Sequence, residues 1–339
     1  MDNFSFRLIN LIDSFRTKKY RIGFAIEDYA PYDRAMASTR LRVYDIIREF
    51  FNDDIYLLAL YRPLKKYDIV IFQKYFDRIA FELADKLRSQ GVKIVLDVNV
   101  NYYDSTSKYI TNEEYLDIVR FTKISDAVVT TTDFLRDSVL ALYPHKKVLL
   151  IEEGIEDRYF KCNKIFPKGK IKLIWSGYAQ KANEILIIKD VLEELYEEFK
   201  FSLFLICEKD PELKIKKIPV YFERYNHSRI AEQLQKGDIF IAPRDLTDSY
   251  NMGHSFTKIG VAMAAGLPVI ASPVPSYVNS PAVLCEDLMQ WRESLRRMLT
   301  DVSYLECLGN LGRDYVKENF SMHKIKPKYK ELFASMLEQ

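Results

Sequence analysis

The residues with the clearest chemical potential lie in one stretch from Asp238 to Tyr277, DIFIAPRDLTDSYNMGHSFTKIGVAMAAGLPVIASPVPSY. Its start reads as a buried strand. After a polar loop we expect a helix with Ser255 as its N-cap and Gly266 just beyond its end. The free amides and partial positive charge of a helix N-terminus suit an anion, and Lys258 adds a full charge in the first turn. The stretch predicts a phosphate or diphosphate site, although a solvated first-turn lysine would give the same pattern.

Other polar residues fall where the predicted strands of the second half end. Arg244 follows the strand DIFIAP, His254 lies beside the expected helix, and Ser272 and Pro273 follow the strand PVIA. Ligands of α/β folds bind outside the carboxyl ends of parallel strands. Each of these residues could therefore contact a bound ligand, whereas a lone loop histidine could equally be polar surface.

Two charged residues in the first half of the chain are candidates for similar reasons. Arg40 occurs at the expected start of a helix, where a cation is electrostatically unfavourable unless it meets an anion. An ion pair with Asp28 or Asp33 would explain this arginine equally well. Asp97 ends the buried strand KIVLDV, so its carboxylate could orient the hydroxyl of a second substrate or cap the following loop.

Several catalytic motifs do not occur in the sequence. The first strand, RIGFAIE, is not followed by GxGxxG, and the chain has no GxxxxGK[ST], GxSxG or HExxH. Only four histidines and four widely spaced cysteines occur, so neither a metal site nor a disulfide framework is predicted. These absences argue against dinucleotide-dependent, P-loop and zinc-dependent enzymes.

Alternating strand-like and helix-like runs supply the scaffold. Apolar runs rich in β-branched residues read as buried parallel strands, and amphipathic runs between them read as helices, which predicts an α/β fold. The strands expected in the first half are Ile22–Ile26, Tyr67–Phe72, Lys93–Val98, Ala127–Thr131 and Val148–Ile151, and the helices are Ser38–Phe51, Arg78–Gln90, Asn112–Ile124 and Thr132–Leu142.

The pattern stops at Gly154–Lys170, a polar segment that we interpret as an interdomain linker, and then restarts. The strands expected in the second half are Lys172–Trp175, Ser202–Cys207, Val220–Phe222, Asp238–Ala242 and Pro268–Ala271, and the helices are Asn183–Phe199, Ser228–Gln235, Ser255–Ala265 and a tail from about Asp287. Two such halves imply a cleft between them, and clefts at domain interfaces are favoured ligand sites.

Length and charge narrow the classes of protein further. A chain of 339 residues suits two domains, and a formal net charge of +2 excludes a globally basic nucleic-acid binder. The first segment lacks the continuous apolar region of a signal peptide, and no apolar run is long enough to span a bilayer. We expect a cytoplasmic protein, with a peripheral membrane contact through the amphipathic first segment as the alternative. The oligomeric state is left open.

The stretch from Lys258 through MAAGLPVIAS resembles the C-terminal signature of GT-B glycosyltransferases, in particular those of family four. The matching residues are Lys258, Met263, Ala264, Gly266, Pro268, Val269, Ile270 and Ala271. Four further segments resemble the family in the right order along the chain: ISDAVVTTTDFLRDSV, VLLIEEGIEDRYF, IKLIWSGYAQK and GRDYVKENFS. One departure is clear, because the two glutamates that the family carries with seven residues between them would fall at Gly253 and Val261.

The resemblance implies two Rossmann-like domains, 1–160 on the acceptor side and 161–322 for the nucleotide sugar, with a tail, 323–339, that returns to the first domain. It implies transfer of a sugar from a nucleotide-diphosphate donor to a hydroxyl of a glycan, glycolipid or polysaccharide, without metal or cofactor and with retained configuration. Taken with the residues argued above, the candidate catalytic residues are Lys258, Arg40 and Asp97, and the candidate donor-binding residues are Gly177, Lys181, Arg244, Gly253, His254, Ser255, Lys258, Ser272 and Pro273.

Two rival interpretations follow from the same residues. Without the paired glutamates, the chain could be a non-catalytic partner subunit or a sugar-binding module of GT-B shape. A different enzyme that acts on nucleotide sugars, such as an epimerase, is the third possibility.

Overall fold

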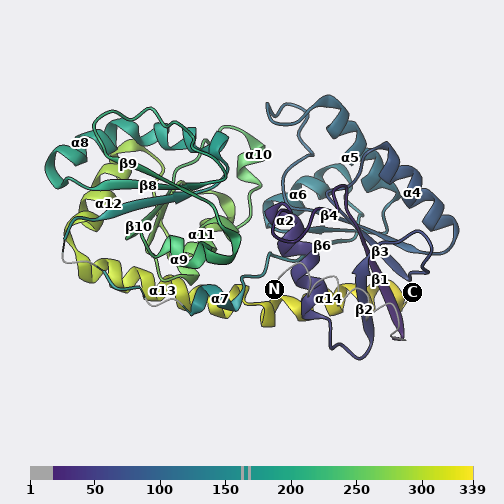
Figure 1. The fold of residues 1–339 in the computed structure, drawn as a ribbon. Helices are drawn as coiled ribbons and strands as arrows, with labels where there is room; N and C mark the ends of the chain where they lie inside the picture. Colours follow the sequence, from purple (N-terminus) through teal and green to yellow (C-terminus); the bar gives the residue numbers. More distant parts are fainter. Residues whose placement is uncertain (1–17, 162–163, 167–168, 339) are drawn as a thin grey trace. The chain divides into compact units, whose positions relative to one another are not determined.

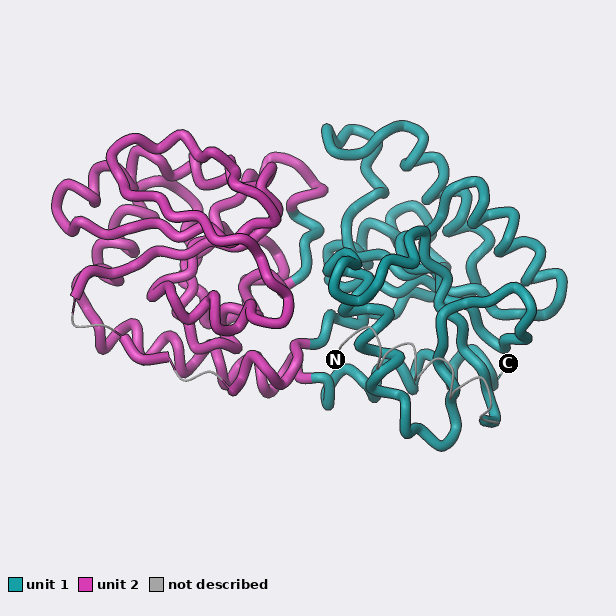
Figure 2. The backbone as a smooth tube through the Cα atoms, in the orientation of Figure 1, with its two compact units in different colours: residues 1–154, 252–255, 322–339 teal, residues 155–251, 256–321 magenta. Residues whose placement is uncertain are grey.

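The computed structural model describes residues 18–161, 164–166 and 169–338. The chain divides into two compact units, coloured separately in Figure 2. Unit 1 comprises residues 1–154, 252–255 and 322–339, and unit 2 comprises residues 155–251 and 256–321. The chain therefore leaves unit 1 after its first sheet and returns there for its last helix.

Unit 1 is built on a six-stranded parallel sheet in the order β2-β1-β3-β4-β5-β6. The five strands expected in this half are present, and the sequence pattern missed the edge strand β2. The strands are β1 (Tyr20–Ala25), β2 (Tyr56–Leu60), β3 (Ile69–Gln73), β4 (Lys93–Val98), β5 (Ala127–Thr130) and β6 (Val148–Leu150). The central strands are buried almost throughout, as their continuous apolar runs require.

Polar caps fix where the helices of unit 1 begin. Asp77 caps α4, Thr132 caps α6, and Thr111 with Glu114 forms a capping box on α5. The helix expected at 38–51 is instead two short α-helical pieces on either side of a π-helical turn. The helices are α2 (Ala37–Thr39), η1 (Arg40–Tyr44), α3 (Asp45–Glu49), α4 (Arg78–Ser89), α5 (Asn112–Ile124), α6 (Asp133–Leu142) and α14 (Met322–Leu337).

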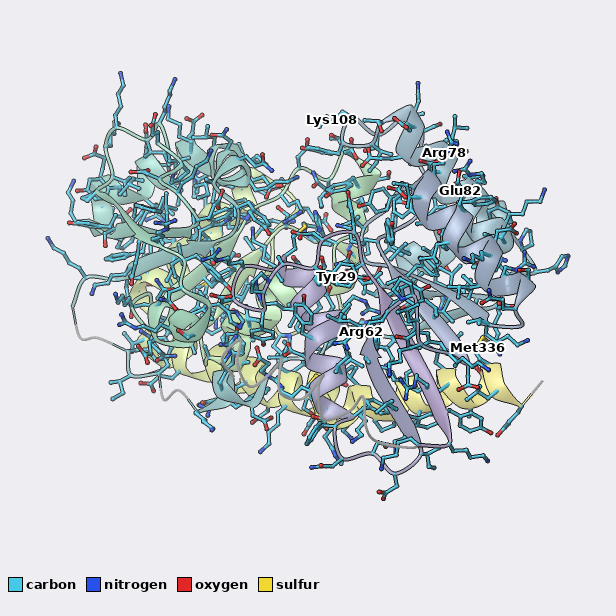
Figure 3. The ribbon with its side chains drawn as sticks, turned by 45° about the vertical axis from the view of Figure 1, so that its right-hand side comes forward. Tyr29, Arg62, Arg78, Glu82, Lys108 and Met336 are labelled. Atoms are coloured by element: carbon cyan, nitrogen blue, oxygen red, sulfur yellow. The ribbon has the colours of Figure 1, made fainter. Side chains whose placement is uncertain are left out.

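Helix α14 is a structural part of unit 1, although the chain reaches it only after unit 2. Figure 1 shows it in yellow beside the strands of this unit, and Figure 3 labels Met336 near its end. Six of its side chains lie in the hydrophobic core of unit 1: Met322, Ile325, Tyr329, Leu332, Phe333 and Met336. Their burial explains how a tail distant in sequence is held in place.

Unit 2 carries a second six-stranded parallel sheet, in the order β12-β11-β10-β7-β8-β9. The five expected strands are present, and the edge strand β12 was missed. The strands are β7 (Lys172–Ser176), β8 (Ser202–Cys207), β9 (Val220–Arg224), β10 (Ile239–Ala242), β11 (Val269–Ala271) and β12 (Val283–Leu284).

The helices of unit 2 depart from expectation mainly after β7, where the expected helix 183–199 begins earlier, as a long 3₁₀ segment. The helical elements are α7 (Asp157–Phe160), η2 (Ala179–Ile188), α8 (Lys189–Phe199), η3 (His227–Arg229), α9 (Ile230–Leu234), α10 (Ser249–Met252), α11 (Thr257–Ala264), η4 (Pro275–Tyr277), α12 (Leu288–Thr300) and α13 (Val302–Phe320). Within residues 18–161, 164–166 and 169–338, no helix is both long and apolar enough to cross a membrane.

Two glycines set the position of α11. Gly266, just beyond the end of this helix, has a φ of +81°, a conformation that favours glycine. Gly309 of α13 lies so close to it that an added Cβ would be 2.4 Å from the carbonyl oxygen of Gly266. The end of α11 is therefore held against α13, and this contact fixes the direction in which its first turn projects.

Candidate functional site

The ammonium of Lys258 lies over an aromatic ring at the carboxyl edge of the sheet of unit 2. Its Nζ is 4.3 Å from the centroid of the Trp175 ring, and Trp175 near the end of β7 is fully buried. Gly177 makes room for this ring, because an added Cβ would be 2.6 Å from Cη2 of Trp175. Helix α11 and strand β7 together therefore position the lysine, and Gly177 acts through the tryptophan.

Two further cations of unit 2, Arg244 and Lys181, act electrostatically on Lys258. Burial, the largest cause, and the charges of Arg244 and Lys181 together lower the pKa of Lys258 to about 7, and the charge of Glu184 opposes this shift. Arg244 follows β10, and Lys181 lies on η2 with its ammonium 5.2 Å from the ring of Tyr250. Three basic side chains near a single carboxylate, that of Glu184, favour the binding of an anion.

One buried carboxylate, that of Glu184, faces these cations. Glu184 is 9% exposed, its nearest charged partner is Nη2 of Arg244 at 3.7 Å, and neither of its oxygens accepts a hydrogen bond from a described residue. Sequence reasoning missed this residue. The only signal was its spacing from Lys181, since residues three apart lie on one face of a 3₁₀ helix. A buried carboxylate without donors is expected to find them in a ligand.

Ser272 holds the backbone of Arg244 in place. The Arg244 amide donates to Oγ of Ser272 at 2.9 Å, and the Ser272 amide donates to the carbonyl of Ala242 at 3.2 Å. Nη1 of Arg244 lies 3.4 Å from Oδ1 of Asn251. Ser272 is buried, and its hydroxyl holds the backbone of the loop that carries Arg244. The adjoining Pro273 is partly exposed.

Backbone amides near Gly177 are already engaged. The Gly177 amide donates to the carbonyl of Ile206 at 3.1 Å. The Ala179 amide, at the start of η2, donates to the carboxylate of Glu208 at 3.0 Å. An anion bound here would therefore meet the side chains of Lys258, Lys181 and Arg244 rather than these two amides.

The prediction that Ser255 caps helix α11 is wrong. The helix begins at Thr257 with Phe256 as its N-cap, and no side chain of the described residues caps its first amides. The Ser255 hydroxyl instead donates to Oε2 of Glu153 at 2.6 Å, and both residues belong to unit 1. Because the Ser255 hydroxyl is hydrogen-bonded to Glu153, no described side chain accepts from the first amides of α11.

Gly253 and His254 belong to the same short segment, Met252–Ser255, which is grouped with unit 1 and not with the cluster around Lys258. An added Cβ at Gly253 would be 2.8 Å from Cδ2 of Leu135 and 3.3 Å from the backbone nitrogen of Asn101. The glutamate that the family resemblance places here would therefore require the Leu135 side chain and the backbone at Asn101 to shift. His254 is partly exposed in this segment.

The side chain at the second expected glutamate position, that of Val261, cannot act as a hydrogen-bond acceptor. Val261, in the middle of α11, is partly buried and packs against the hydrophobic core of unit 2. Its side chain has no hydrogen-bonding atom, so it cannot hold a ribose hydroxyl.

In unit 1 the candidate arginine and aspartate are placed differently from the prediction. Arg40 is 7% exposed and donates to the carbonyl of Ala35, so it is not an open cation at a helix start. Asp97 is fully buried and forms an ion pair with Arg42, whose Nε is 2.5 Å from its Oδ1. Burial raises the pKa of Asp97, and the Arg42 guanidinium opposes that rise. Asp97 therefore neither reaches an acceptor hydroxyl nor caps its loop with this oxygen.

A metal site requires several ligating side chains that converge on one ion. Within the described ranges, no group of three or more His, Cys, Asp or Glu side chains is arranged to hold a metal ion. The charge at the site around Lys258 is supplied by lysine and arginine.

The chain resembles several solved structures closely in fold and only distantly in sequence. A glycosyltransferase from Rickettsia africae matches with a TM-score of 0.65 and 13% identity, covering 95% of this chain and 100% of that chain. Anabaena HepE in complex with UDP-glucose matches with a TM-score of 0.69 and 10% identity, covering 93% and 100%. A UDP-forming trehalose-phosphate synthase from Burkholderia xenovorans matches with a TM-score of 0.59 and 14% identity, covering 81% and 75%. No protein-family model and no curated protein matches the sequence.

These likenesses establish the fold. Two α/β units, each built on a parallel six-stranded sheet, are shared with glycosyltransferases along almost the whole chain, so the expected GT-B fold is confirmed. Fold alone does not carry function, and the chemistry has to be argued from the site.

Proposed function

We propose that the protein is a glycosyltransferase that takes a sugar from a nucleotide-diphosphate donor bound on unit 2. One observation carries the proposal: the ammonium of Lys258 lies over the Trp175 ring within reach of the charges of Lys181, Arg244 and Glu184, at the edge of the sheet where α/β folds bind ligands. A diphosphate supplies the two negative charges that this cluster lacks. The likeness to HepE, which was solved with UDP-glucose, supports a nucleotide sugar as the source of that diphosphate.

The mechanism follows from where charge develops. When the bond between the sugar and the diphosphate breaks, negative charge grows on the leaving oxygen, and preorganised cations stabilise it. Lys258 is suited to this role, because an arriving anion raises its lowered pKa and so locks the ammonium in its charged form. The proposal includes a reaction that needs no metal ion and retains the anomeric configuration.

Glu184 is our candidate for the task that relatives give to their paired glutamates. Hydroxyl groups of the ribose or of the donor sugar would supply the hydrogen bonds that its carboxylate lacks within the described residues. Its position on η2, beside Lys181, places a hydroxyl acceptor next to the cations. In this chain the function would thus move from helix α11 to the segment after β7.

The acceptor in this proposal is a hydroxyl of a glycan or of a lipid-linked sugar, held by unit 1. The absence of room for a glutamate at Gly253 favours one rival, a binding module that holds a nucleotide sugar without transferring it. Both interpretations predict donor binding, and only the first predicts turnover.

A combined binding and turnover measurement tests the proposal. Nucleotide sugars should raise the melting temperature of the purified chain, because a ligand that binds only the folded state stabilises it. Donor and acceptor together should release nucleoside diphosphate and form a glycoside, and Lys258→Ala should slow release at least about a hundredfold. Binding without any product would favour the binding module, and an altered free nucleotide sugar would indicate an epimerase. Unchanged turnover in Lys258→Ala would refute the assigned role.

A further inference from the structure

A pocket of about 310 Å³ lies wholly within unit 1, at the carboxyl ends of β1, β3 and β4. Its volume falls at the lower end of the range found for ligand pockets. Its walls come from the loop after β1, the start of α2, the loop after β3 and the first turns of α5. No group in it belongs to the cation cluster of unit 2.

The floor of the pocket offers a hydrogen-bond donor that the protein does not use. Gln73, the last residue of β3, is 3% exposed and lines the pocket. Its Oε1 accepts from the hydroxyl of Thr39 at 3.4 Å, but Nε2 has no partner in the part of the chain that the structure describes. A buried donor left without an acceptor destabilises the fold, so a ligand oxygen is expected to meet it.

The next residue, Lys74, brings the only positive charge among the lining residues. It has a φ of +50°, in the left-handed region that side chains rarely adopt, and its ammonium lies 5.9 Å from the ring of Tyr102. Burial lowers the pKa of Lys74. Phe76 packs edge-on against Tyr102 with the ring centroids 4.8 Å apart, which gives the pocket an apolar wall. Such a wall suits the C–H faces of a sugar ring.

Six carboxylates outnumber this lysine among the lining residues: Glu27, Asp28, Asp77, Glu113, Glu114 and Asp117. Three of these carboxylates already have partners. Asp77 accepts a hydrogen bond from the Ala80 amide, Glu114 accepts one from the Thr111 amide, and Asp117 pairs with Arg120.

Glu27, Asp28 and Glu113 are exposed at the pocket, and no described residue forms an ion pair or hydrogen bond with their carboxylates. The nearby cation on α4, Arg78, pairs with Glu82 at 2.9 Å, and Figure 3 labels both side chains on this helix. The negative charge at the pocket is therefore not neutralised by Arg78.

We infer that this pocket holds the sugar of the acceptor and that it selects a sugar without anionic groups. The inference rests on the proposed transferase function, because it names the acceptor class of that reaction. Gln73 and Lys74 donate to hydroxyl or ring oxygens at the floor, and the aromatic wall receives the ring. The three free carboxylates accept from sugar hydroxyls, whereas they repel a carboxylate or phosphate on the sugar.

Three methyl glycosides that share one ring test this selectivity: methyl glucoside, methyl glucosaminide and methyl glucuronide. Their dissociation constants for the full-length chain without donor can be measured by ligand-observed NMR. The glucuronide should bind about tenfold more weakly than the glucoside at low ionic strength, and added salt should narrow the difference. The glucosaminide should bind at least as tightly as the glucoside.

Variants separate charge selection from mere loss of the pocket. The triple change Glu27→Gln, Asp28→Asn and Glu113→Gln should remove the discrimination, because the amides keep oxygen acceptors for the sugar hydroxyls but lose the charge that repels the glucuronide. Gln73→Leu should weaken all three sugars to a similar degree. The matched control neutralises three exposed carboxylates of unit 2, with Glu293→Gln, Glu306→Gln and Glu318→Gln, and should leave the discrimination intact.

Each outcome decides for or against the inference. Equal or tighter binding of the glucuronide, discrimination that survives the triple change, or no binding of any of the three sugars would overturn it. A melting-temperature shift with UDP-glucose, measured on the same samples, reports on unit 2 alone. If that shift is present and the sugars fail, the acceptor inference falls and the proposed donor site stands. If the shift is absent, the proposed function itself falls.

Discussion

The pKa of Lys258 makes donor binding depend on pH in a direction that can be worked out. The free protein holds this lysine near pKa 7, because burial and the charges of Arg244 and Lys181 disfavour the ammonium. A bound diphosphate neutralises those charges and raises the pKa, so binding is linked to uptake of a proton above pH 7. Affinity for a nucleotide sugar should be constant below about pH 6 and should fall as the pH rises through 7.

The expected size follows from the protonated fraction. Half of the free protein carries the ammonium at pH 7 and about one part in thirty does so at pH 8.5, so the dissociation constant should rise about fifteenfold across this range. UDP-glucose suits the measurement, since its diphosphate keeps its charge there. Isothermal titration in two buffers with different heats of ionisation would report the proton uptake directly.

Lys258→Arg is the matched control, because a guanidinium stays protonated throughout this range. Its affinity should be nearly independent of pH between 6 and 8.5. A wild-type dissociation constant that stays flat over the same interval, or a slope that survives in Lys258→Arg, would refute the assignment of the depressed pKa to the donor site. The same linkage has a stability side. The folded pKa lies below the unfolded value of 10.5, so the ligand-free protein should gain stability as the pH rises from 7 to 10.

Three further substitutions test other parts of the structure. Gly177→Ala should push the Trp175 ring away from Lys258 and weaken UDP-glucose binding about tenfold, whereas Gly169→Ala, which has nothing within 4 Å of its added Cβ, should bind normally in a fluorescence titration. Asp97→Ala should leave the buried Arg42 guanidinium without its carboxylate partner, which should cost about 3–5 kcal/mol of stability and lower the melting temperature of unit 1. The double change with Arg42→Met should recover part of this loss, and neither variant should alter donor binding. Gly253→Glu should lower stability by about 1–3 kcal/mol without raising turnover, and an active, stable variant would show that this position is open after all.

The sequence was sufficient for the elements that bury continuous apolar runs. Ten expected strands are present in the two sheets, because β-branched runs between polar segments have few other solutions in an α/β chain. The edge strands β2 and β12 were missed. Val283–Leu284 is only two residues long, and the YLLAL of β2 follows a polar turn without the β-branched residues that mark the others.

Local sequence features were enough to identify some candidate residues, whereas the position of others depends on structure that the sequence pattern does not show. Lys258 and Arg244 were found because their positions relative to strand ends are local features of the sequence. Arg40 was singled out because a cation at the start of a regular helix was expected to meet an anion. The π-helical turn Arg40–Tyr44 adds a residue per turn and changes which side chains face inward, and hydrophobic periodicity does not reveal such a turn.

Long-range contacts account for the remaining differences. Ser255 has every local property of an N-cap, yet its hydroxyl donates to Glu153, a residue 102 positions earlier in the chain. Asp97 lies at the expected strand end, but its partner is a buried arginine from another element. Glu184 has no motif around it, and only the folded unit brings its carboxylate to Arg244. In each case a polar group is satisfied, or left unsatisfied, by residues that no short window of sequence contains.

The two units also differ in the sign of the charge at their candidate sites, and this difference has a consequence for how substrates would be sorted. The cluster of unit 2 carries three cations against Glu184, whereas the pocket of unit 1 carries six carboxylates against Lys74. A nucleotide diphosphate is attracted to the first and repelled by the second, while an uncharged sugar gains nothing from the cations. Each substrate would therefore have one site with favourable electrostatics. The carboxylates of the unit 1 pocket would repel a nucleotide-sugar donor, whereas the same carboxylates would accept hydrogen bonds from an uncharged acceptor sugar.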